Sequence, residues 1–346
     1  MFYRLGETIE NNLDYIRSHT FAPKDPKKWA VICEHIVRHY NEGWADGYYM
    51  NIEYWEIWNE PEGASKTSPN WSGTPLAYYE LYRITANHLK SCFPDIKVGG
   101  FACTGFYEIG TEERHTQNFL KGFFDYITAS ETKAPIDFFS WHTYTTSVER
   151  IRFAIEESQR FLAGYNLEHI ENIIDEWNYT KNWAPTEGPL RKSMLGAAFV
   201  SATHSVMQKS ALSKSMYYDA EPDRISFCGL FNEYTRKNEK PYYSFVAFGK
   251  LYTLVTEVNI TDDVDGIYTL AATDGEKHAI MLTNYGGADT NLKIELNNTG
   301  SANTVNIYII DENYDLDKTL SVKADRNLSS VEIVIKTNSI VFIELT

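Results

Sequence analysis

The stretch YWEIWNEPEG, residues 54–63, decides the fold class because it joins an apolar strand to a polar end. Aromatic and branched residues over 52–58 predict a buried β-strand. Asn59 and Glu60 follow this strand directly, and Pro61 ends it. A carboxylate at the end of a buried strand costs stability unless the protein uses it. The stretch therefore predicts a strand that delivers a functional glutamate.

Predicted strands and helices alternate on both sides of this stretch. Strands are predicted at 2–6, 52–58, 96–102, 136–144, 170–177 and 213–220. Helices are predicted at 26–42, 74–89, 116–129, 150–164, 189–209 and 241–255. Such alternation indicates βα units and a parallel sheet, and strands that are apolar on both sides indicate that both faces of the sheet are covered.

The pattern changes after about residue 256. Five short runs rich in β-branched residues follow, separated by Asn, Gly, Asp and Ser, and they lie at 277–284, 291–297, 304–310, 330–337 and 339–345. Runs of this kind predict an antiparallel β-sandwich. The sequence thus predicts an α/β catalytic domain of the (β/α)8 TIM-barrel type over residues 1–255 and a β-sandwich domain over 256–346.

The composition excludes several classes of partner. The 346 residues carry a net charge of −15, which would repel nucleic acid phosphates and anionic membrane surfaces. No apolar run approaches the roughly 18 residues of a membrane span, and the first residues resemble no signal peptide. We therefore expect a soluble protein that binds neither nucleic acid nor membrane, in a compartment that the sequence does not identify.

The sequence indicates no metal site and no cofactor. The four cysteines show no CxxC spacing and stand in apolar surroundings, so they are predicted to be buried thiols rather than zinc ligands or disulfides. His35 and His39 are four residues apart on a predicted helix, but a solvated helix surface is the better explanation. The cysteines are Cys33, Cys92, Cys103 and Cys228.

Polar residues also follow three other predicted strands. The strand over 136–141 leads to His142 and Tyr144. The strand over 170–174 leads to Glu176. In a β/α barrel the carboxyl ends of the strands meet at one mouth, where the active site lies. The strand over 213–218 leads to Tyr218. Asp175 and Trp177 flank Glu176, and Asp175 is expected to point away from it.

Two strand-end carboxyls with different tasks are the requirement of a glycosidase. One must donate a proton to the leaving oxygen, and the other must be ionised to attack or to activate water. Glu60 and Glu176 lie on separate strands and are both flanked by aromatic residues, so they are the candidate pair.

The sequences WEIWNEP, SWHTY and IIDEWNYT, in this order, resemble glycoside hydrolase family 39. The resemblance implies a (β/α)8 barrel with catalytic glutamates at the ends of strands 4 and 7, which correspond here to Glu60 and Glu176. It covers residues 1 to about 255 and extends into the β module. The reaction implied is a β-glycosidase reaction that retains anomeric configuration, most simply that of an exo-acting β-xylosidase on an oligosaccharide or other glycoside.

The same resemblance implies a role for each matching residue. Glu60 would be the general acid/base and Glu176 the nucleophile, with carboxyls about 5–5.5 Å apart. Asn59 would hydrogen-bond the sugar 2-hydroxyl, His142 would line the site near the sugar, and Tyr144 would orient Glu176. Trp177 and Tyr218 are candidates for stacking on sugar rings.

The chain departs from this family at its N-terminal end. If Glu60 ends strand 4, then three βα units should precede it, and only one strand and one helix are predicted there. A segment missing upstream, a gap closed by a loop or by a second copy of the chain, and a wrong strand register are three explanations that remain open. The sequence therefore predicts a barrel with strands 3–8 only, whose open edge a homo-oligomer could cover.

Two functions follow from this conflict between intact motifs and an incomplete barrel. One is a retaining glycosidase whose preference has drifted from xylose, because the region near residue 218 lacks the expected Trp. The other is a degenerate or truncated protein that binds carbohydrate with little or no hydrolysis.

Overall fold

The computed structural model describes most of the chain, which divides into two compact units. The described residues are 1–6, 21–62, 70–105, 115–182, 187–220, 222, 229–261, 264–300, 302–323 and 329–346. The first unit comprises Met1–Thr143, Phe153–Trp177 and Ala211–Met216, and the second comprises Tyr144–Arg152, Asn178–Ser210 and Tyr217–Thr346. This division does not follow a single boundary near residue 255, because several strand ends and helices belong to the second unit.

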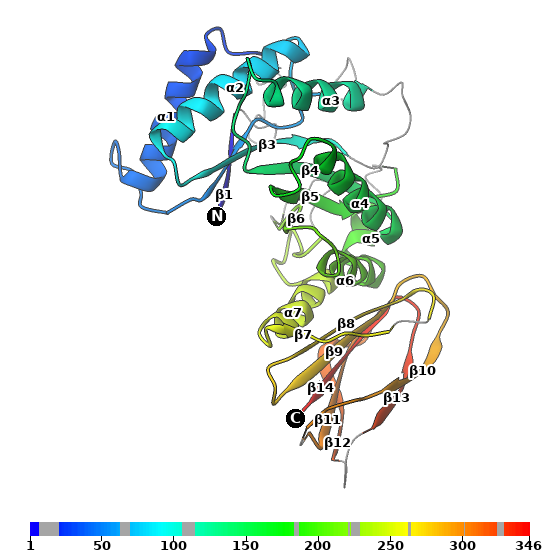
Figure 1. Cartoon of the computed structure of the whole chain (residues 1–346). Coiled ribbons are helices and arrows are strands. Elements are labelled where there is room, and N and C mark those ends of the chain that lie inside the picture. The colour runs from blue at the N-terminus through cyan, green and yellow to red at the C-terminus, as the bar shows by residue number, and fades with distance from the viewer. Residues whose placement is uncertain are drawn as a thin grey trace. The chain divides into compact units, whose positions relative to one another are not determined.

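A six-stranded sheet in the order β1-β2-β3-β4-β5-β6 confirms the predicted α/β class (Figure 1). Neighbouring strands from β1 to β4 pair in parallel, as βα units require. Within the described ranges the sheet ends at β1 on one side and β6 on the other, so a half-barrel is seen rather than eight closed strands. The strands are β1 (Phe2–Leu5), β2 (Tyr54–Ile57), β3 (Lys97–Cys103), β4 (Phe138–Thr145), β5 (Glu171–Tyr179) and β6 (Lys214–Tyr217).

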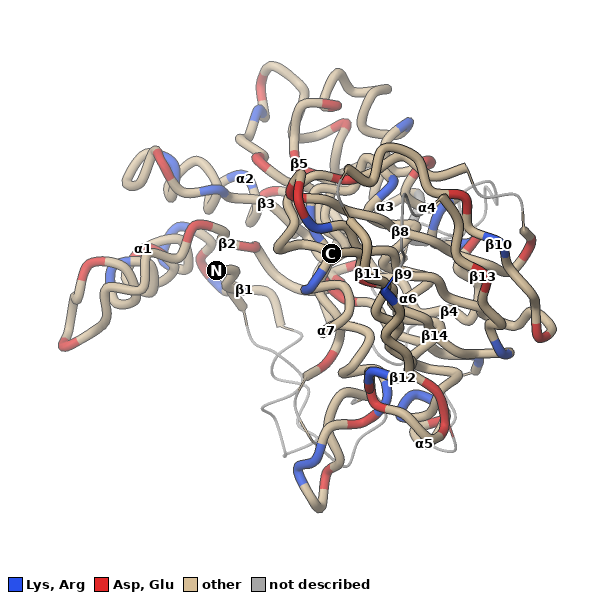
Figure 2. Tube along the Cα trace, turned by 90° about the horizontal axis from the view of Figure 1, so that it is seen from below, with Lys and Arg blue, Asp and Glu red and all other residues tan. Residues whose placement is uncertain are grey.

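Helix α1 (Pro26–Glu42) begins and ends as the sequence predicts. Asp25 accepts hydrogen bonds from the backbone N–H groups of Lys27 and Lys28, and Gly43 ends the helix at a φ of +72°. Basic and acidic positions both occur along this helix (Figure 2). Arg38 forms ion pairs with Glu34 one turn before it and with Glu42 one turn after it. These i,i+4 pairs stabilise a helix surface by a few tenths of a kcal/mol each.

Helices α2 (Pro75–Cys92), α3 (His115–Thr128) and α4 (Val148–Gly164) also lie close to their predicted ranges. Helix α2 packs against α1 and holds the end of β2 in place. The buried hydroxyl of Tyr78 donates a 2.8 Å hydrogen bond to the carbonyl of Ile57, the last residue of β2. This contact fixes the strand end from which Asn59 and Glu60 follow.

The second unit contains α5 (Gly188–Lys192), α6 (Met194–Gln208) and α7 (Lys240–Tyr252). The single helix predicted over 189–209 is wrong, because Ser193 interrupts it with an extended backbone. The Ser193 side chain accepts a hydrogen bond from the N–H of Leu195, so this residue ends one helix and caps the next.

Antiparallel strands make up the rest of the second unit. Eight strands are described where five runs were predicted, because β8 is rich in small residues and the largely exposed β12 is mostly polar. Pairing gives one sheet in the order β12-β11-β14-β9-β8-β7 and a second sheet of β10 and β13. The eight strands are β7 (Thr256–Glu257), β8 (Ile267–Thr273), β9 (His278–Asn284), β10 (Thr290–Glu295), β11 (Thr304–Ile310), β12 (Asp315–Lys323), β13 (Ser330–Ile335) and β14 (Ser339–Leu345).

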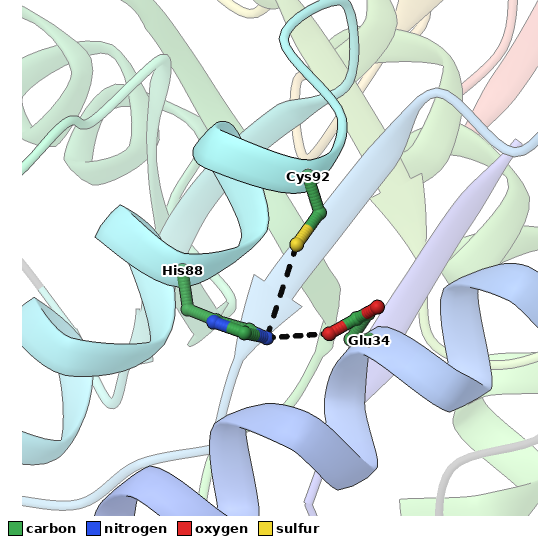
Figure 3. A group of neighbouring side chains, drawn as sticks. All are labelled: Glu34, His88 and Cys92. Atoms are coloured by element: carbon green, nitrogen blue, oxygen red, sulfur yellow. Dashed lines mark hydrogen bonds and ion pairs between the residues drawn. The ribbon is translucent and has the colours of Figure 1, made fainter.

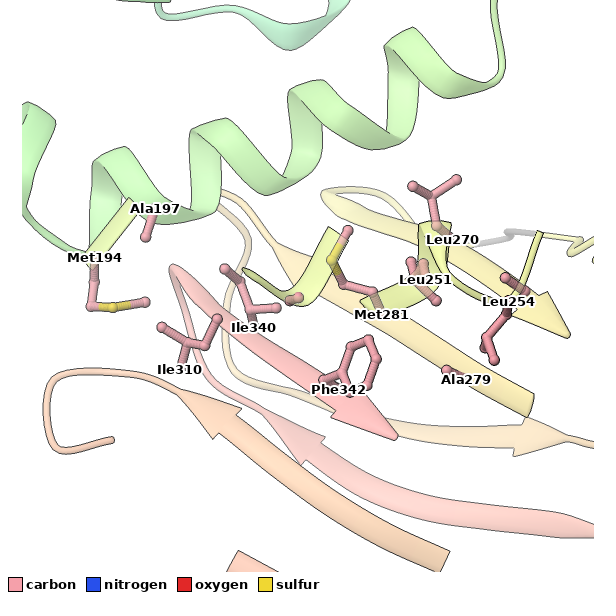
Figure 4. Packing of buried hydrophobic residues seen from close by; sticks show 12 residues of the cluster. Met194, Ala197, Leu251, Leu254, Leu270, Ala279, Met281, Ile310, Ile340 and Phe342 are labelled. Atoms are coloured by element: carbon pink, nitrogen blue, oxygen red, sulfur yellow. The ribbon is translucent and has the colours of Figure 1, made fainter. Parts of the chain in front are cut away.

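The central strands of the larger antiparallel sheet are buried on both faces. On one face, Met281 and Phe342 pack with Ala197 of α6 and Leu251 of α7, as Figure 4 shows. On the other face, side chains of the larger sheet share a second hydrophobic cluster with Val331 of β13. Burial on two sides explains why the runs at β9 and β14 carry consecutive apolar residues on both faces instead of alternating. None of the described helices is long and apolar enough to cross a membrane.

The predicted burial of the cysteines is confirmed only in part. Cys33 and Cys103 are buried free thiols, whereas Cys92 at the end of α2 is half-buried. Cys228 lies outside the described residues.

Candidate active site

The turn after β2 carries Glu60 in a strained backbone. Trp58 and Glu60 both have positive φ angles, +76° and +46°. For a residue with a Cβ, the left-handed region raises the conformational free energy by about 1–2 kcal/mol, and residues strained in this way are concentrated at functional sites. The backbone N–H of Glu60 donates to the carbonyl of Ala102 in the neighbouring strand β3, which holds the turn in place. The strain at Glu60 is thus consistent with a side chain placed for function.

A single imidazole joins the two predicted glutamates. His142 on β4 is completely buried, and its Nδ1 lies 2.6 Å from Oε1 of Glu60. Its Nε2 lies 3.4 Å from Oε1 of Glu176 on β5. Glu60 and Glu176, which are 82 and 34 positions from His142 in the sequence, therefore contact the two nitrogens of one imidazole ring. This places Glu60 and Glu176 in the same site, at the same end of the sheet.

The charge of His142 follows from its surroundings. Burial lowers the pKa of the imidazole, but the carboxylates of Glu176 and Asp175 outweigh burial and raise it well above its ordinary value. The hydrogen bond to Glu60 acts in the same direction. His142 is therefore an imidazolium at neutral pH, and it supplies a fixed positive charge between the two glutamates.

Arg4 is a site residue that sequence reasoning missed. It lies on β1, and its guanidinium donates to Glu56 at 2.6 Å, to Asp175 at 2.7 Å and to Glu176 at 2.9 Å. Burial lowers the pKa of this guanidinium, but the three carboxylates raise it well above its ordinary value. The signal in the sequence was a single arginine inside the predicted strand over 2–6, because a charge in a buried strand requires partners.

Glu56 lies behind the site on β2, in a position to which the sequence assigned no role. Its side chain is fully buried and accepts hydrogen bonds from Arg4 and from Ser140 Oγ, the latter at 2.5 Å. Burial and the charge of Asp175 raise its pKa to about 8, against the opposing effects of Arg4 and Ser140. Burial thus favours the protonated form of Glu56, whereas the guanidinium of Arg4, 2.6 Å from its Oε2, favours the carboxylate.

The prediction that Asp175 points away from Glu176 is wrong. Its Oδ2 accepts from Arg4 at 2.7 Å and lies 3.4 Å from Nε2 of His142, and Glu176 contacts the same two cations. Burial raises the pKa of Asp175, but His142 and Arg4 outweigh burial and lower it. The forked guanidinium reaches both carboxylates, so alternation along β5 does not separate them.

The remaining predicted residues occupy different positions. The side-chain oxygen of Asn59 is buried and has no hydrogen-bond partner within the described residues, which suits a ligand contact. Trp177 is 1% exposed, so its ring is packed inside the protein, and this burial argues against a sugar platform. Tyr144 lies two residues beyond His142 on β4, and Tyr218 follows β6; both belong to the second unit.

Glu62, two residues after Glu60, is a second buried carboxyl that the sequence did not indicate. Its Oε1 accepts from the backbone N–H and the hydroxyl of Thr104, and its Oε2 is buried with no partner in the described part of the chain. Burial, followed by the charge of Glu60, raises the pKa of Glu62 to about 7. A carboxyl in such surroundings stays protonated well above pH 5.

This raised pKa predicts a pH-dependent cost to stability. The unfolded chain loses the Glu62 proton near pH 4.5 and the folded chain near pH 7, so the free energy of unfolding should fall as pH rises through this window, by up to about 3 kcal/mol. Glu62→Gln should remove this contribution and flatten the dependence between pH 5 and pH 8. Urea unfolding at pH 5 and at pH 8 measures the change in the free energy of unfolding between the two pH values. Replacement of the exposed Glu295 by Gln is the control. Equal slopes for Glu62→Gln and the control would contradict the prediction.

The fold and the site together define a class. A parallel βα sheet whose strand ends bring carboxylates around a buried cation is an arrangement found in barrel-type hydrolases of sugars. The model of the family described as "Glycosyl hydrolases family 39" matches residues 11–281. The chain belongs to glycosyl hydrolase family 39.

Individual relatives agree with this assignment. A β-xylosidase of Geobacillus stearothermophilus is 31% identical over 135 residues, which is 38% of this chain and 23% of that protein. A β-xylosidase of Caldicellulosiruptor saccharolyticus is 25% identical over 134 residues, 39% of this chain and 24% of that protein. The matches therefore span about a quarter of the length of these curated relatives.

Solved structures share the fold. A glucosidase from Croceicoccus marinus superimposes with a TM-score of 0.77 at 23% identity, covering 96% of this chain and 76% of that one. A monomeric β-xylosidase from Caulobacter crescentus CB15 gives a TM-score of 0.71 at 17% identity, covering 94% and 76%.

Proposed function

We propose that the protein is a retaining, exo-acting β-glycosidase that resembles a β-xylosidase, with Glu60 as general acid/base and Glu176 as nucleophile. The observation that carries the proposal is the contact of both carboxylates with the two nitrogens of His142. Membership of family 39 and the names of the β-xylosidase relatives support the substrate class. We further propose the family's complete β/α barrel and β-sandwich as the architecture in which this half-barrel works.

In the first step an oxygen of Glu176 attacks the anomeric carbon of the glycoside. The bond from this carbon to the leaving oxygen breaks, and Glu60 gives that oxygen a proton. In the second step water attacks the same carbon, Glu60 takes a proton from the water, and the bond to Glu176 breaks. Two inversions at one carbon give net retention.

The charged neighbours fit these two tasks. A nucleophile must be a carboxylate, and Arg4 donates to Glu176 at 2.9 Å. Glu60 must exchange a proton in both steps, and the imidazolium of His142, 2.6 Å from Oε1, can supply that proton and take it back, while the amide of Asn70 donates to Oε2 at 3.3 Å. Asn59 is proposed to bind the sugar 2-hydroxyl and Tyr144 to orient Glu176.

Replacing Glu60 by Gln tests the acid/base role. The loss in kcat/KM should depend on the leaving group: about 10²–10⁴-fold for an unactivated alkyl β-xyloside, which needs the proton, and much less for a dinitrophenyl β-xyloside, which does not. Proton NMR of the first product formed by the unaltered protein should show the β-anomer. An equal loss for both leaving groups, or an α-anomer as first product, would remove Glu60 from this role.

A second candidate function is carbohydrate binding with little hydrolysis. The observation that favours it is the half-barrel, because β1 has no neighbour on its outer side among the described strands. Calorimetry with xylo-oligosaccharides, run alongside product analysis, separates the two. Binding without turnover would favour this candidate, and turnover that depends on Glu60 and Glu176 would favour the glycosidase.

A further inference from the structure

Three side chains with metal-ligating atoms converge between helices α1 and α2, as Figure 3 shows. Glu34 comes from α1, and His88 and Cys92 come from consecutive turns of α2. Nε2 of His88 lies 2.7 Å from Oε2 of Glu34 and 3.9 Å from Sγ of Cys92. One ligand atom of each residue lies within 4.8 Å of the other two. None of the three belongs to the carboxylate site around His142.

The carboxylate of Glu34 is already oriented toward this point. Its other oxygen, Oε1, accepts a 2.8 Å hydrogen bond from Arg38 one turn later on α1. That hydrogen bond lowers the pKa of Glu34, with burial opposing and His88 adding to the effect. A ligand held by a hydrogen bond on its far atom is the usual support of a protein metal site. Arg38 therefore leaves Oε2 as the oxygen available beside His88.

We propose that Glu34, His88 and Cys92 bind one zinc ion between α1 and α2. A thiolate, an imidazole and a carboxylate are the three donor types that Zn²⁺ takes, at about 2.3, 2.0–2.1 and 2.0–2.2 Å. Sulfur and nitrogen donors disfavour Mg²⁺ and Ca²⁺, which take oxygen ligands. The fourth tetrahedral position is left to water, because these three are the whole cluster among the described residues.

Small movements convert the cluster into a ligand set. Two ligands on a tetrahedral zinc ion are separated by roughly 3.3–3.6 Å, as the bond lengths require. The distance of 3.9 Å between Cys92 and His88 is close to this range, and the distance of 2.7 Å between His88 and Glu34 must open slightly. All three residues lie on well-formed helices, so the required shift falls on side-chain torsions alone.

The proton balance of binding is defined. Zinc binds the thiolate form of Cys92 and the lone pair on Nε2 of His88. With the metal on Nε2, the imidazole proton lies on Nδ1, and the thiol releases one proton to water. The carboxylate and the thiolate together balance the two charges of Zn²⁺. Zinc uptake should therefore weaken as pH falls below neutral.

Elemental analysis after gel filtration tests the proposal on the full chain, with zinc chloride as the only added ligand. We expect one zinc per chain and a rise of a few degrees in Tm on zinc addition, because the ion binds the folded state only. Cys92→Ser should lose both effects, since a serine hydroxyl is of similar size but is a poor zinc ligand. His35→Gln is the matched control, because His35 lies on α1 against the ring of Trp44 and should leave zinc uptake unchanged.

A second readout identifies the sulfur ligand directly. Cobalt(II) in place of zinc should give a thiolate-to-metal charge-transfer band in the near ultraviolet, and Cys92→Ser should abolish it. No zinc retained above a buffer control, or equal zinc and cobalt signals in Cys92→Ser and in the unaltered chain, would overturn the proposal. The result is independent of glycosidase activity, which is measured separately.

Discussion

Glu176→Gln is expected to lower kcat/KM for an aryl β-xyloside by roughly 10⁴-fold or more, because a neutral amide, which is a poor nucleophile, replaces the carboxylate proposed to attack the anomeric carbon. The fold should survive this change, since the amide oxygen can still accept from Arg4, which now donates to Oε1 of Glu176 at 2.9 Å. Steady-state rates with a dinitrophenyl xyloside measure the loss. A good leaving group does not offset it, in contrast to the expectation for Glu60→Gln.

Glu171→Gln is the matched control on the same strand. Glu171 begins β5, pairs with Lys97 and Lys214, and lies at the opposite end of the strand from the site. Its replacement should leave kcat/KM within a few-fold of the unaltered protein. A 2-deoxy-2-fluoro xyloside with an activated leaving group should also label the peptide that contains Glu176. Label on another carboxylate, or substantial turnover by Glu176→Gln, would identify a different nucleophile.

Arg4→Met is expected to destabilise the protein by about 3–5 kcal/mol at neutral pH. Arg4 is the cation shared by Glu56, Asp175 and Glu176, and its side chain is only 18% exposed. Removing it leaves several carboxyls close together in a dry site with the imidazolium of His142 as their remaining buried cation among the described contacts. Urea unfolding at pH 7 measures the cost, which should shrink at pH 4 as carboxyls gain protons.

Arg160→Met is the control for the loss of an arginine as such. Arg160 on α4 is 63% exposed and pairs with acidic neighbours on its own helix, where an ion pair contributes about 0–1 kcal/mol. A cost for Arg4→Met no larger than that for Arg160→Met would show that the buried network does not depend on its guanidinium.

The main site residues could be predicted because each stands directly after an apolar run. Glu60, His142 and Glu176 interrupt or end apolar runs that predict buried strands, and such a local pattern can be recognised from the sequence alone. The caps of α1 were equally local, since Asp25 and Gly43 act within a few residues of themselves. The limits of α1 follow from such short-range signals, whereas the break at Ser193 between α5 and α6 was not predicted.

Other features depend on contacts that no local pattern carries. Arg4 has partners 52, 171 and 172 residues away, so its role depends on the order of the strands in the sheet. The direction of the Asp175 side chain was predicted wrongly, because alternation along a strand does not show that one guanidinium, that of Arg4, contacts both Asp175 and Glu176. Strand β12 is held by backbone pairing to β11, and its exposed, mainly polar sequence gives no hydrophobic signal.

The position of Arg4 on the first strand has a thermal consequence. Within the described sheet β1 is an edge strand that pairs only with β2, through four residues, so it can detach without breaking any other strand pair. When β1 detaches, the cation leaves the carboxylates of β2 and β5 while the antiparallel sheets of the other unit are still folded. On heating, the proposed glycosidase activity would then be lost at a lower temperature than secondary structure.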